Sequence, residues 1–214
     1  MATAHRSRIL IAEDHQLVAE ALKHVLESEF EVIGIVNDGR TLVKAAGQLR
    51  PDVVIADIAM PLLNGLEAGE QIKQLSPATK LIFVTMNSSP EVAAEAFRRG
   101  ASAYVVKHST AQDLVIAVRR VVKNESYLSP LITKETVEFL LRSGGVPKLG
   151  PQLTARQAEV LQLLAEGKAM KEVAYILNIK QGTVAFHKYK IMETLGVNSN
   201  AALIEYAIRN HVVA

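Results

Sequence analysis

Residues 53–57 read Val53-Val54-Ile55-Ala56-Asp57, a short apolar run that ends in a carboxylate. Consecutive Val and Ile residues are typical of a strand that is buried on both faces, as strands are in a parallel sheet covered by helices. Four further runs of this kind occupy residues 9–12, 32–36, 81–85 and 103–106. The sequence therefore predicts five buried strands.

Amphipathic helical patterns alternate with these runs. Their apolar residues recur at the spacing of one helix face, and they occupy residues 16–27, 41–49, 64–75, 90–99 and 110–122. Five strand–helix units in succession predict an α/β domain over residues 1–123, built on a doubly wound, five-stranded parallel sheet.

The pattern changes after residue 123. Residues 124–150 contain one candidate helix, at 131–142, and then Gly and Pro residues, so we interpret them as a linker. From residue 151 to 214 only helical patterns remain, joined by short connections, which predicts an all-α, four-helix domain of the helix-turn-helix kind. These helical patterns occupy residues 155–166, 170–177, 182–195 and 201–209.

The composition agrees with two globular domains. A chain of 214 residues, 49% of them hydrophobic and 21% charged, is long enough for two cores. It has no cysteine, which excludes disulfides, thiolate metal sites and a cysteine nucleophile, and leaves hard cations as the natural metals. The polar N-terminus carries no signal-peptide pattern, and no stretch is long enough to span a membrane, so we expect a cytoplasmic protein.

The net charge of +2 conceals a local basic patch between residues 168 and 190. Such a patch suits a polyanion, although a solvated helix face is an equal alternative from charge alone. Its five lysines against a single acid, Glu172, are Lys168, Lys171, Lys180, Lys188 and Lys190.

Polar side chains stand where four of the predicted strands end: Glu13 and Asp14, Asp57, Thr85, and Lys107. In a doubly wound sheet, ligands collect at the carboxyl ends of the strands. Crowded carboxylates repel one another unless a cation compensates their charge or they take up protons. A single such acid is often only a helix cap, but acids at successive strand ends predict a site for Mg²⁺ or Mn²⁺.

With a hard divalent ion in place, Asp57 can attack a phosphorus atom in line and form an acyl phosphate. Lys107 would pair with one phosphoryl oxygen and Thr85 would donate a hydrogen bond to another, which makes a switch. Tyr104 lies three residues before Lys107. It would swing inward when Thr85 moves, or it is simply a half-buried strand aromatic.

This part of the chain resembles the CheY-like receiver family, of flavodoxin-like fold, across residues 8–122. The resemblance implies that Asp57 is the phosphoacceptor, that Glu13 and Asp14 are the acidic pair for Mg²⁺, and that Ala59 supplies a carbonyl ligand. It also implies signalling roles for Thr85, Tyr104 and Lys107. The motifs that carry it are Ile11-Ala12-Glu13-Asp14-His15, Asp57-Ile58-Ala59-Met60-Pro61, Val84-Thr85 and Val106-Lys107.

One position departs from the receiver pattern. Many receivers place a proline after the lysine, in a cis peptide, whereas His108 stands here. A cis bond without proline costs about 3 kcal/mol. The geometry of this loop is therefore open, and we do not interpret His108 as a loss of function.

The last domain resembles the LuxR-type four-helix domain of NarL/FixJ regulators over residues 151–212. Thr154 is placed to cap its first helix. Departures from the family pattern are Gln157, Ala169, Lys180 and Ala185. The motifs that carry the resemblance are Leu153-Thr154, Arg156, Glu159-Val160-Leu161, Lys171-Glu172, Thr183-Val184, His187 and Leu195-Gly196-Val197.

Residues 183–192 form the candidate reading helix, which would enter the major groove. Ala185, Phe186 and Tyr189 would face base edges, where apolar side chains favour thymine methyl groups or DNA shape; packing is an equal alternative for the two aromatics. Residues expected on phosphates are Lys171, Thr183, His187, Lys188 and Lys190, with burial as the alternative for His187. In the fourth helix, Ala202, Leu203 and Tyr206 are expected to pack on the core and to form a dimer surface, as in related domains.

These features predict a two-component response regulator that is not a turnover enzyme. A sensor histidine kinase would phosphorylate Asp57, and the protein would then bind double-stranded promoter DNA, as a homodimer when phosphorylated or DNA-bound. A hydrolase with an aspartyl phosphate intermediate is a rival, but Ala59 stands where such enzymes typically place a second acid. A DNA-binding protein that is never phosphorylated is the other rival.

Overall fold

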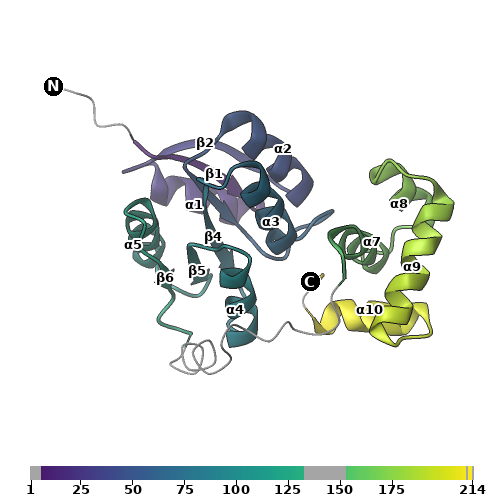
Figure 1. The fold of residues 1–214 in the computed structure, drawn as a ribbon. Helices are drawn as coiled ribbons and strands as arrows, with labels where there is room; N and C mark the ends of the chain where they lie inside the picture. The colour runs from purple at the N-terminus through teal and green to yellow at the C-terminus, as the bar shows by residue number, and fades with distance from the viewer. Residues whose placement is uncertain (1–5, 133–152, 211, 214) are drawn as a thin grey trace.

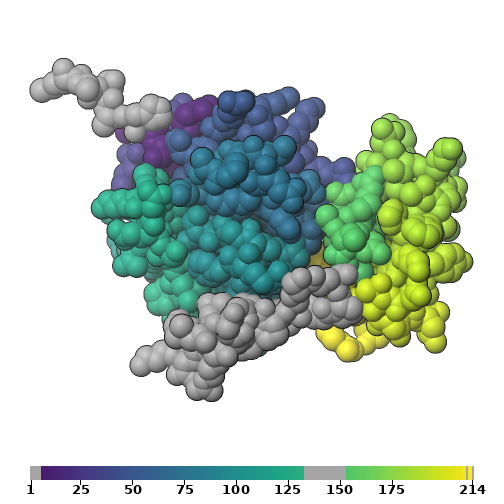
Figure 2. All heavy atoms as spheres, in the orientation of Figure 1, coloured from purple at the N-terminus to yellow at the C-terminus, as the bar shows by residue number. Residues whose placement is uncertain are grey.

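The computed structural model describes residues 6–132, 153–210 and 212–213, which form two lobes (Figure 1). We call residues 6–132 the N-terminal lobe and residues 153–213 the C-terminal lobe. The predicted helix at 131–142 falls largely outside the described residues. Figure 2 shows the two lobes in contact along one side.

The N-terminal lobe is built on a parallel sheet with the strand order β2-β1-β3-β4-β5-β6. Its first five strands match the predicted apolar runs. The sheet is formed by β1 (Arg8–Ala12), β2 (Glu31–Val36), β3 (Val53–Ala56), β4 (Lys80–Thr85), β5 (Ala103–Val106) and β6 (Tyr127–Leu128).

The sixth strand is the element of the sheet that the sequence did not predict. It has two residues, too few for a periodic pattern, and it pairs with β5 in the segment interpreted as linker. Tyr127 anchors it: its hydroxyl donates to Asp113 Oδ1 at 3.0 Å, and the Arg120 guanidinium lies 5.7 Å from its ring centroid.

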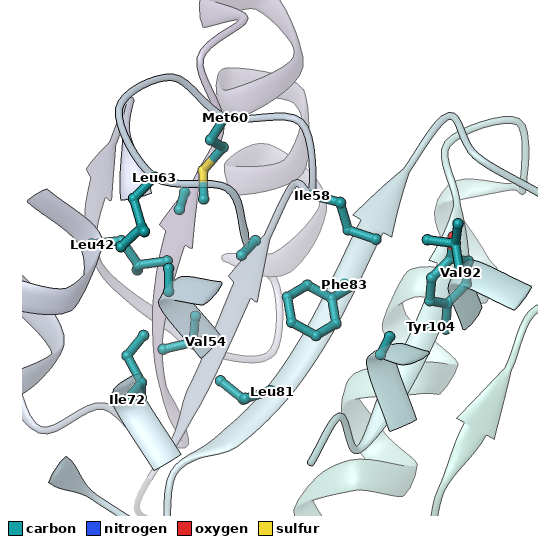
Figure 3. Close-up of a cluster of buried hydrophobic side chains, with 14 of the residues drawn as sticks. Leu42, Val54, Ile58, Met60, Leu63, Ile72, Leu81, Phe83, Val92 and Tyr104 are labelled. Atoms are coloured by element: carbon teal, nitrogen blue, oxygen red, sulfur yellow. The ribbon is translucent and has the colours of Figure 1, made fainter. Parts of the chain in front are cut away.

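Five helices cover both faces of the sheet, as predicted. Buried side chains of α2, α3 and α4 pack on one face, and those of α1 and α5 pack on the other. Figure 3 shows the first of these clusters, where Met60 and Leu63 approach Leu42 of α2 at one end. The helices are α1 (Gln16–Leu26), α2 (Gly39–Leu49), α3 (Gly65–Leu75), α4 (Pro90–Arg98) and α5 (Ala111–Val122).

The C-terminal lobe consists of four helices around their own apolar cluster, which confirms the predicted fold class. Thr154 caps α7 as predicted: Thr154 Oγ1 accepts from Gln157 N–H at 3.3 Å, and Gln157 Oε1 accepts from Thr154 N–H at 2.8 Å. Gln157 thus completes a capping box. The helices are α7 (Ala155–Ala165), α8 (Met170–Ile176), α9 (Gln181–Leu195) and α10 (Asn200–Arg209).

Candidate functional site

The predicted acidic cluster forms at the carboxyl edge of the sheet. Strands β1 and β3 are neighbours in register, with Ala12 opposite Ala56, so the acids that follow the two strands meet. Ligand atoms of Glu13, Asp14, His15 and Asp57 all lie within 4.8 Å of one another.

Lys107 crosses from the end of β5 into this cluster. Its Nζ donates to Asp57 Oδ2 at 2.6 Å and lies 2.7 Å from Glu13 Oε2. Partial burial works to lower the pKa of Lys107, but the contacts with Asp57 and Glu13 outweigh it and raise the pKa above its usual value. Lys107 therefore stays protonated and places a positive charge beside the Asp57 carboxylate.

The donor set fits a hard divalent cation. Glu13 and Asp57 are 2% and 5% exposed, and Glu13 Oε2 is buried with no hydrogen bond of good geometry among the described residues, although it lies near Lys107. Glu13, Asp14 and Asp57 offer carboxylate oxygens, which are the ligand atoms that Mg²⁺ prefers. The cluster could hold such an ion.

His15 belongs to this cluster, although the sequence did not single it out as a ligand. Its Nδ1 lies 2.9 Å from Asp14 Oδ1 and 3.1 Å from Glu13 Oε1. The negative charge of Asp14, followed by the contacts with Glu13, raises the pKa of His15 above its usual value.

Thr85 and Tyr104 meet at one loop residue that the sequence analysis missed, Asn87. Thr85 Oγ1 accepts from Asn87 N–H at 3.3 Å, and the Tyr104 hydroxyl donates to Asn87 C=O at 2.8 Å. Tyr104 is fully buried rather than half-buried, and burial together with the charge of Asp57 raises its pKa, so the phenol stays protonated. The only sequence signal for Asn87 was its position two residues after Thr85.

Residues 58–64, which we call the Asp57 loop, are closely tied to Asp57. Ala59 N–H donates to Asp57 Oδ1 at 3.3 Å, and Gly65 N–H donates to Ile58 C=O at 2.8 Å. A Cβ atom on Gly65 would lie 2.0 Å from the Asp57 carbonyl oxygen, so only glycine fits there. No peptide bond among the described residues is cis, so the bond between Lys107 and His108 is trans.

The face of α9 that was predicted to read DNA is exposed. Phe186 and Tyr189 are 59% and 69% exposed, while Val184 and Ile191 point into the core of the lobe. Lys171, Thr183 and Lys190 are exposed, and Ala185, His187 and Lys188 are partly exposed. In α10, Leu203 packs inside the lobe, whereas Ala202 and Tyr206 are partly exposed.

The two lobes meet through α7 and the Asp57 loop, a contact that the sequence did not predict. Gln162 Nε2 donates to Met60 C=O at 2.8 Å, and Gln162 Oε1 accepts from Asn64 N–H at 2.7 Å. Glu166 Oε1 accepts from Leu62 N–H at 2.9 Å. The side chain of Leu62 packs against the apolar cluster of the C-terminal lobe.

A second set of contacts lies beside this one. Glu159 of α7 accepts from Arg40 Nη2 and from Gln71 Nε2, both at 3.2 Å. Glu159 also pairs with Arg156 of its own helix at 2.7 Å. These polar contacts use residues from the middle of α7 to its C-terminal end, and they leave the face of α9 that was predicted to read DNA exposed.

Two protein families match the chain, one for each lobe. Residues 9–119 match the family described as "Response regulator receiver domain", and residues 151–207 match "Bacterial regulatory proteins, luxR family". Among the described residues, no helix is long and apolar enough to cross a membrane.

The similarity to known proteins extends over nearly the whole chain. The oxygen regulatory protein NreC of Staphylococcus carnosus is 31% identical over 214 residues, which are 96% of this chain and 99% of NreC. The RcsB response regulator of Salmonella typhimurium superposes with a TM-score of 0.65 at 26% identity, covering 98% of this chain and 100% of that one. RcsB of Salmonella enterica serovar Typhimurium, bound to promoter rprA in the presence of the phosphomimetic BeF3-, superposes with a TM-score of 0.62 at 26% identity, covering 94% and 98%.

Proposed function

This chain belongs to the response regulators that join a receiver domain to a LuxR-type DNA-binding domain, and on that premise we propose that phosphorylation of Asp57 controls its binding to promoter DNA. The observation that carries the proposal is the buried Asp57 carboxylate, which lies between Lys107 Nζ at 2.6 Å and the acids Glu13 and Asp14. We propose domain limits of 1–123 and 151–214, with the connecting residues 124–150 contributing β6 to the sheet of the first domain.

The proposed reaction is a phosphoryl transfer from a sensor histidine kinase. A carboxylate oxygen of Asp57 forms a bond to phosphorus as the bond from phosphorus to the donor nitrogen breaks, and that nitrogen leaves with the electron pair. Glu13, Asp14, Asp57 and the carbonyl of Ala59 would hold Mg²⁺ or Mn²⁺, which compensates the charge of the transferred group. Lys107 neutralises a phosphoryl oxygen on the other side.

The same residues would transmit the change. Within the described part of the chain, the Thr85 hydroxyl accepts a hydrogen bond but donates none. It could therefore donate to a phosphoryl oxygen, which would draw Thr85 toward Asp57. Because Thr85 and Tyr104 both bond to Asn87, a movement of Thr85 reaches the buried phenol through one loop residue. This linkage supports a switch role for both side chains.

The C-terminal lobe would bind double-stranded DNA through α9. The exposed Phe186 and Tyr189, with Ala185, are proposed to face base edges, and Lys171, Thr183, His187, Lys188 and Lys190 are proposed to contact phosphates. RcsB relatives form dimers and bind DNA, and we propose a homodimer here, through Ala202 and Tyr206 of α10, with Leu203 supporting them from the core. A regulator of bacterial promoters acts in the cytoplasm.

The chain offers a matched pair of aspartates for the test. Asp57 follows β3, and Asp52 precedes the same strand at its opposite end, where it accepts a hydrogen bond from Arg8 N–H. With acetyl phosphate and Mg²⁺, we expect the wild type and Asp52→Asn to gain the mass of one phosphoryl group, and Asp57→Asn to gain none.

DNA binding is measured on the same samples at matched salt, because affinity for DNA depends steeply on salt. Phosphodonor should tighten promoter binding by the wild type and by Asp52→Asn but not by Asp57→Asn. Equal phosphoryl uptake by all three proteins would refute Asp57 as the acceptor. An affinity that phosphodonor leaves unchanged would favour a constitutive DNA-binding protein.

A further inference from the structure

The residue that follows β6 lies against the loop that carries Lys107, residues 107–110, which we call the Lys107 loop. The Ser129 hydroxyl lies 2.6 Å from the Ser109 hydroxyl of this loop, so one of the two donates a hydrogen bond to the other. Ser129 N–H donates to Tyr104 C=O at 2.9 Å, which continues the pairing of β6 with β5. The backbone of Ser129 is therefore fixed on the sheet, and its side chain reaches the loop.

The contact between the two hydroxyls is buried on the side of Ser129. Ser129 is 1% exposed, and a buried hydroxyl needs a hydrogen-bond partner. Among the described residues, Ser109 supplies that partner. The chain after Ser129 is held as well, because Ile132 N–H donates to Ser129 C=O at 2.9 Å and the Ile132 side chain packs in the same apolar cluster as Tyr104.

The far end of the Lys107 loop is held by the same strand. Asp113 Oδ2 accepts from Thr110 N–H at 2.9 Å and from Thr110 Oγ1 at 2.8 Å, which closes the loop at the start of α5. Asp113 Oδ1 accepts from the Tyr127 hydroxyl at 3.0 Å. Residues 127–129 therefore stabilise both the middle and the end of the loop.

The Lys107 loop begins with the cation of the proposed phosphorylation site. Ser109 N–H donates to Val106 C=O at 2.8 Å, which closes a tight turn around Lys107. From this turn the Lys107 ammonium reaches Asp57 Oδ2 at 2.6 Å and Glu13 Oε2 at 2.7 Å. A long lysine side chain loses much rotamer freedom in such a contact, so its placement depends on a backbone that does not move. A displacement of about 1 Å can cost roughly 100-fold in rate.

We propose that Ser129 is a positioning residue for Lys107: through Ser109 it holds the turn from which the Lys107 ammonium meets the Asp57 carboxylate and the incoming phosphoryl group. This inference rests on the proposed function of Asp57. The effect of Ser129 passes through the backbone of the Lys107 loop, not through a contact with the phosphoryl group. Because Ser129 belongs to residues 124–150, the connection between the lobes begins inside the proposed phosphorylation site.

The first test measures phosphoryl uptake from acetyl phosphate with Mg²⁺ in Ser109→Ala, Ser129→Ala and the double variant. We expect each single variant to take up the phosphoryl group about fivefold more slowly than the wild type, which corresponds to the loss of one hydrogen bond. The double variant should be no slower than the slower single variant, because both substitutions break the same bond. Ser126→Ala is the matched control and should match the wild type, since Ser126 is an exposed serine directly before β6.

The second test observes Lys107 itself, without phosphodonor, by NMR of protein labelled with nitrogen-15 in its lysine side chains. The wild type should show an ammonium signal for Lys107, because the hydrogen bond to Asp57 and the nearby Glu13 carboxylate slow the exchange of its protons. Lys107→Arg assigns this signal by removing it. We expect the signal to weaken or shift in Ser109→Ala and Ser129→Ala but not in Ser126→Ala.

The outcomes separate this inference from the proposed function. If the wild type is phosphorylated on Asp57 and neither single variant slows uptake, the positioning role is refuted and the proposed function stands. A double variant slowed by the product of the two single effects, or a Lys107 signal that neither variant changes, also refutes the positioning role. Because Ser109 is partly exposed, Ser109→Ala provides both tests even if Ser129→Ala does not fold. If neither the wild type nor any variant takes up phosphate, both hypotheses fall.

Discussion

At the scale of single residues, Gly65 is the backbone position that constrains Asp57 most directly. An added Cβ would lie 2.0 Å from Asp57 O and 3.0 Å from Ile58 Cα, which are backbone atoms with little room to move. We expect Gly65→Ala to lower the free energy of unfolding by about 1–3 kcal/mol, the usual cost of overpacking. Denaturant unfolding followed by circular dichroism measures it.

Gly47 is the matched control for this prediction. It lies inside α2, and a Cβ there would meet no atom within 4 Å. Gly47→Ala should stabilise the protein by about 0.5–1 kcal/mol, because alanine loses less backbone entropy in a helix than glycine does. A Gly65→Ala variant as stable as Gly47→Ala would show that the backbone behind Asp57 yields easily.

The residues of the acidic site divide into those that sequence patterns reveal and those that they do not. Asp57, Asp14 and Lys107 were predicted to meet because parallel strands bring their carboxyl ends to one edge, so strand order suffices. Asn87 contacts Thr85 and Tyr104 through its backbone groups. Gln162 contacts a loop of the other lobe through its side chain. Their positions depend on the packed structure, and no periodic pattern marks them.

At the scale of elements, long patterns were predictable and short ones were not. The four-residue run of β3 was visible because all of its side chains are buried, whereas β6 has two residues and depends on Tyr127 packing under β5 and α5. Capping followed local chemistry: Thr154 was identified as the cap of α7 from sequence. The charged cluster that joins α3 to α4, formed by Glu67, Glu70, Glu95 and Arg99, was not predicted, because its charges come from separate helices.

That cluster supports a prediction with a pH dependence. Arg99 at the end of α4 pairs with Glu67 and Glu70 of α3 and with Glu95 of its own helix. Burial, only partly offset by Arg99, raises the pKa of Glu67 above its usual value. We expect Arg99→Met to lower the free energy of unfolding at pH 7 by about 2 kcal/mol, less than for a fully buried pair because Glu70 is half exposed.

The sign of the pH dependence follows from Glu67. A carboxyl group whose pKa is higher in the folded than in the unfolded state costs stability as the pH rises through that raised pKa. Without Arg99 this cost grows, so the difference between Arg99→Met and wild type should shrink as the pH falls from 7 toward 5. Arg119→Met, which breaks an exposed pair with Glu29, should change stability little at either pH. A difference for Arg99→Met that does not vary with pH would contradict this account.

At the scale of the whole molecule, the sequence predicted two domains but not how they meet. Hydrophobic periodicity reports which face of an element is buried, not which partner buries it. Leu62 illustrates this: it stands in a loop of the N-terminal lobe, yet it packs against the apolar cluster of the C-terminal lobe. No sequence pattern predicts the polar contacts near Leu62 either, which come from Gln162, Glu166 and Glu159.

Leu62 therefore offers a direct test of the docked arrangement. In Leu62→Glu, a carboxylate would enter an apolar cluster without a partner and would lie close to Glu166, which bonds to the backbone of the same residue. Because Leu62 is only partly buried and lies in a loop, we expect the lobes to stay folded and to separate, with a larger radius of gyration in small-angle X-ray scattering. Leu75→Glu is the control, because Leu75 at the end of α3 is already 64% exposed, and its scattering curve should match the wild type. If Leu62→Glu scatters like Leu75→Glu while circular dichroism shows both variants folded, Leu62 does not hold the lobes together.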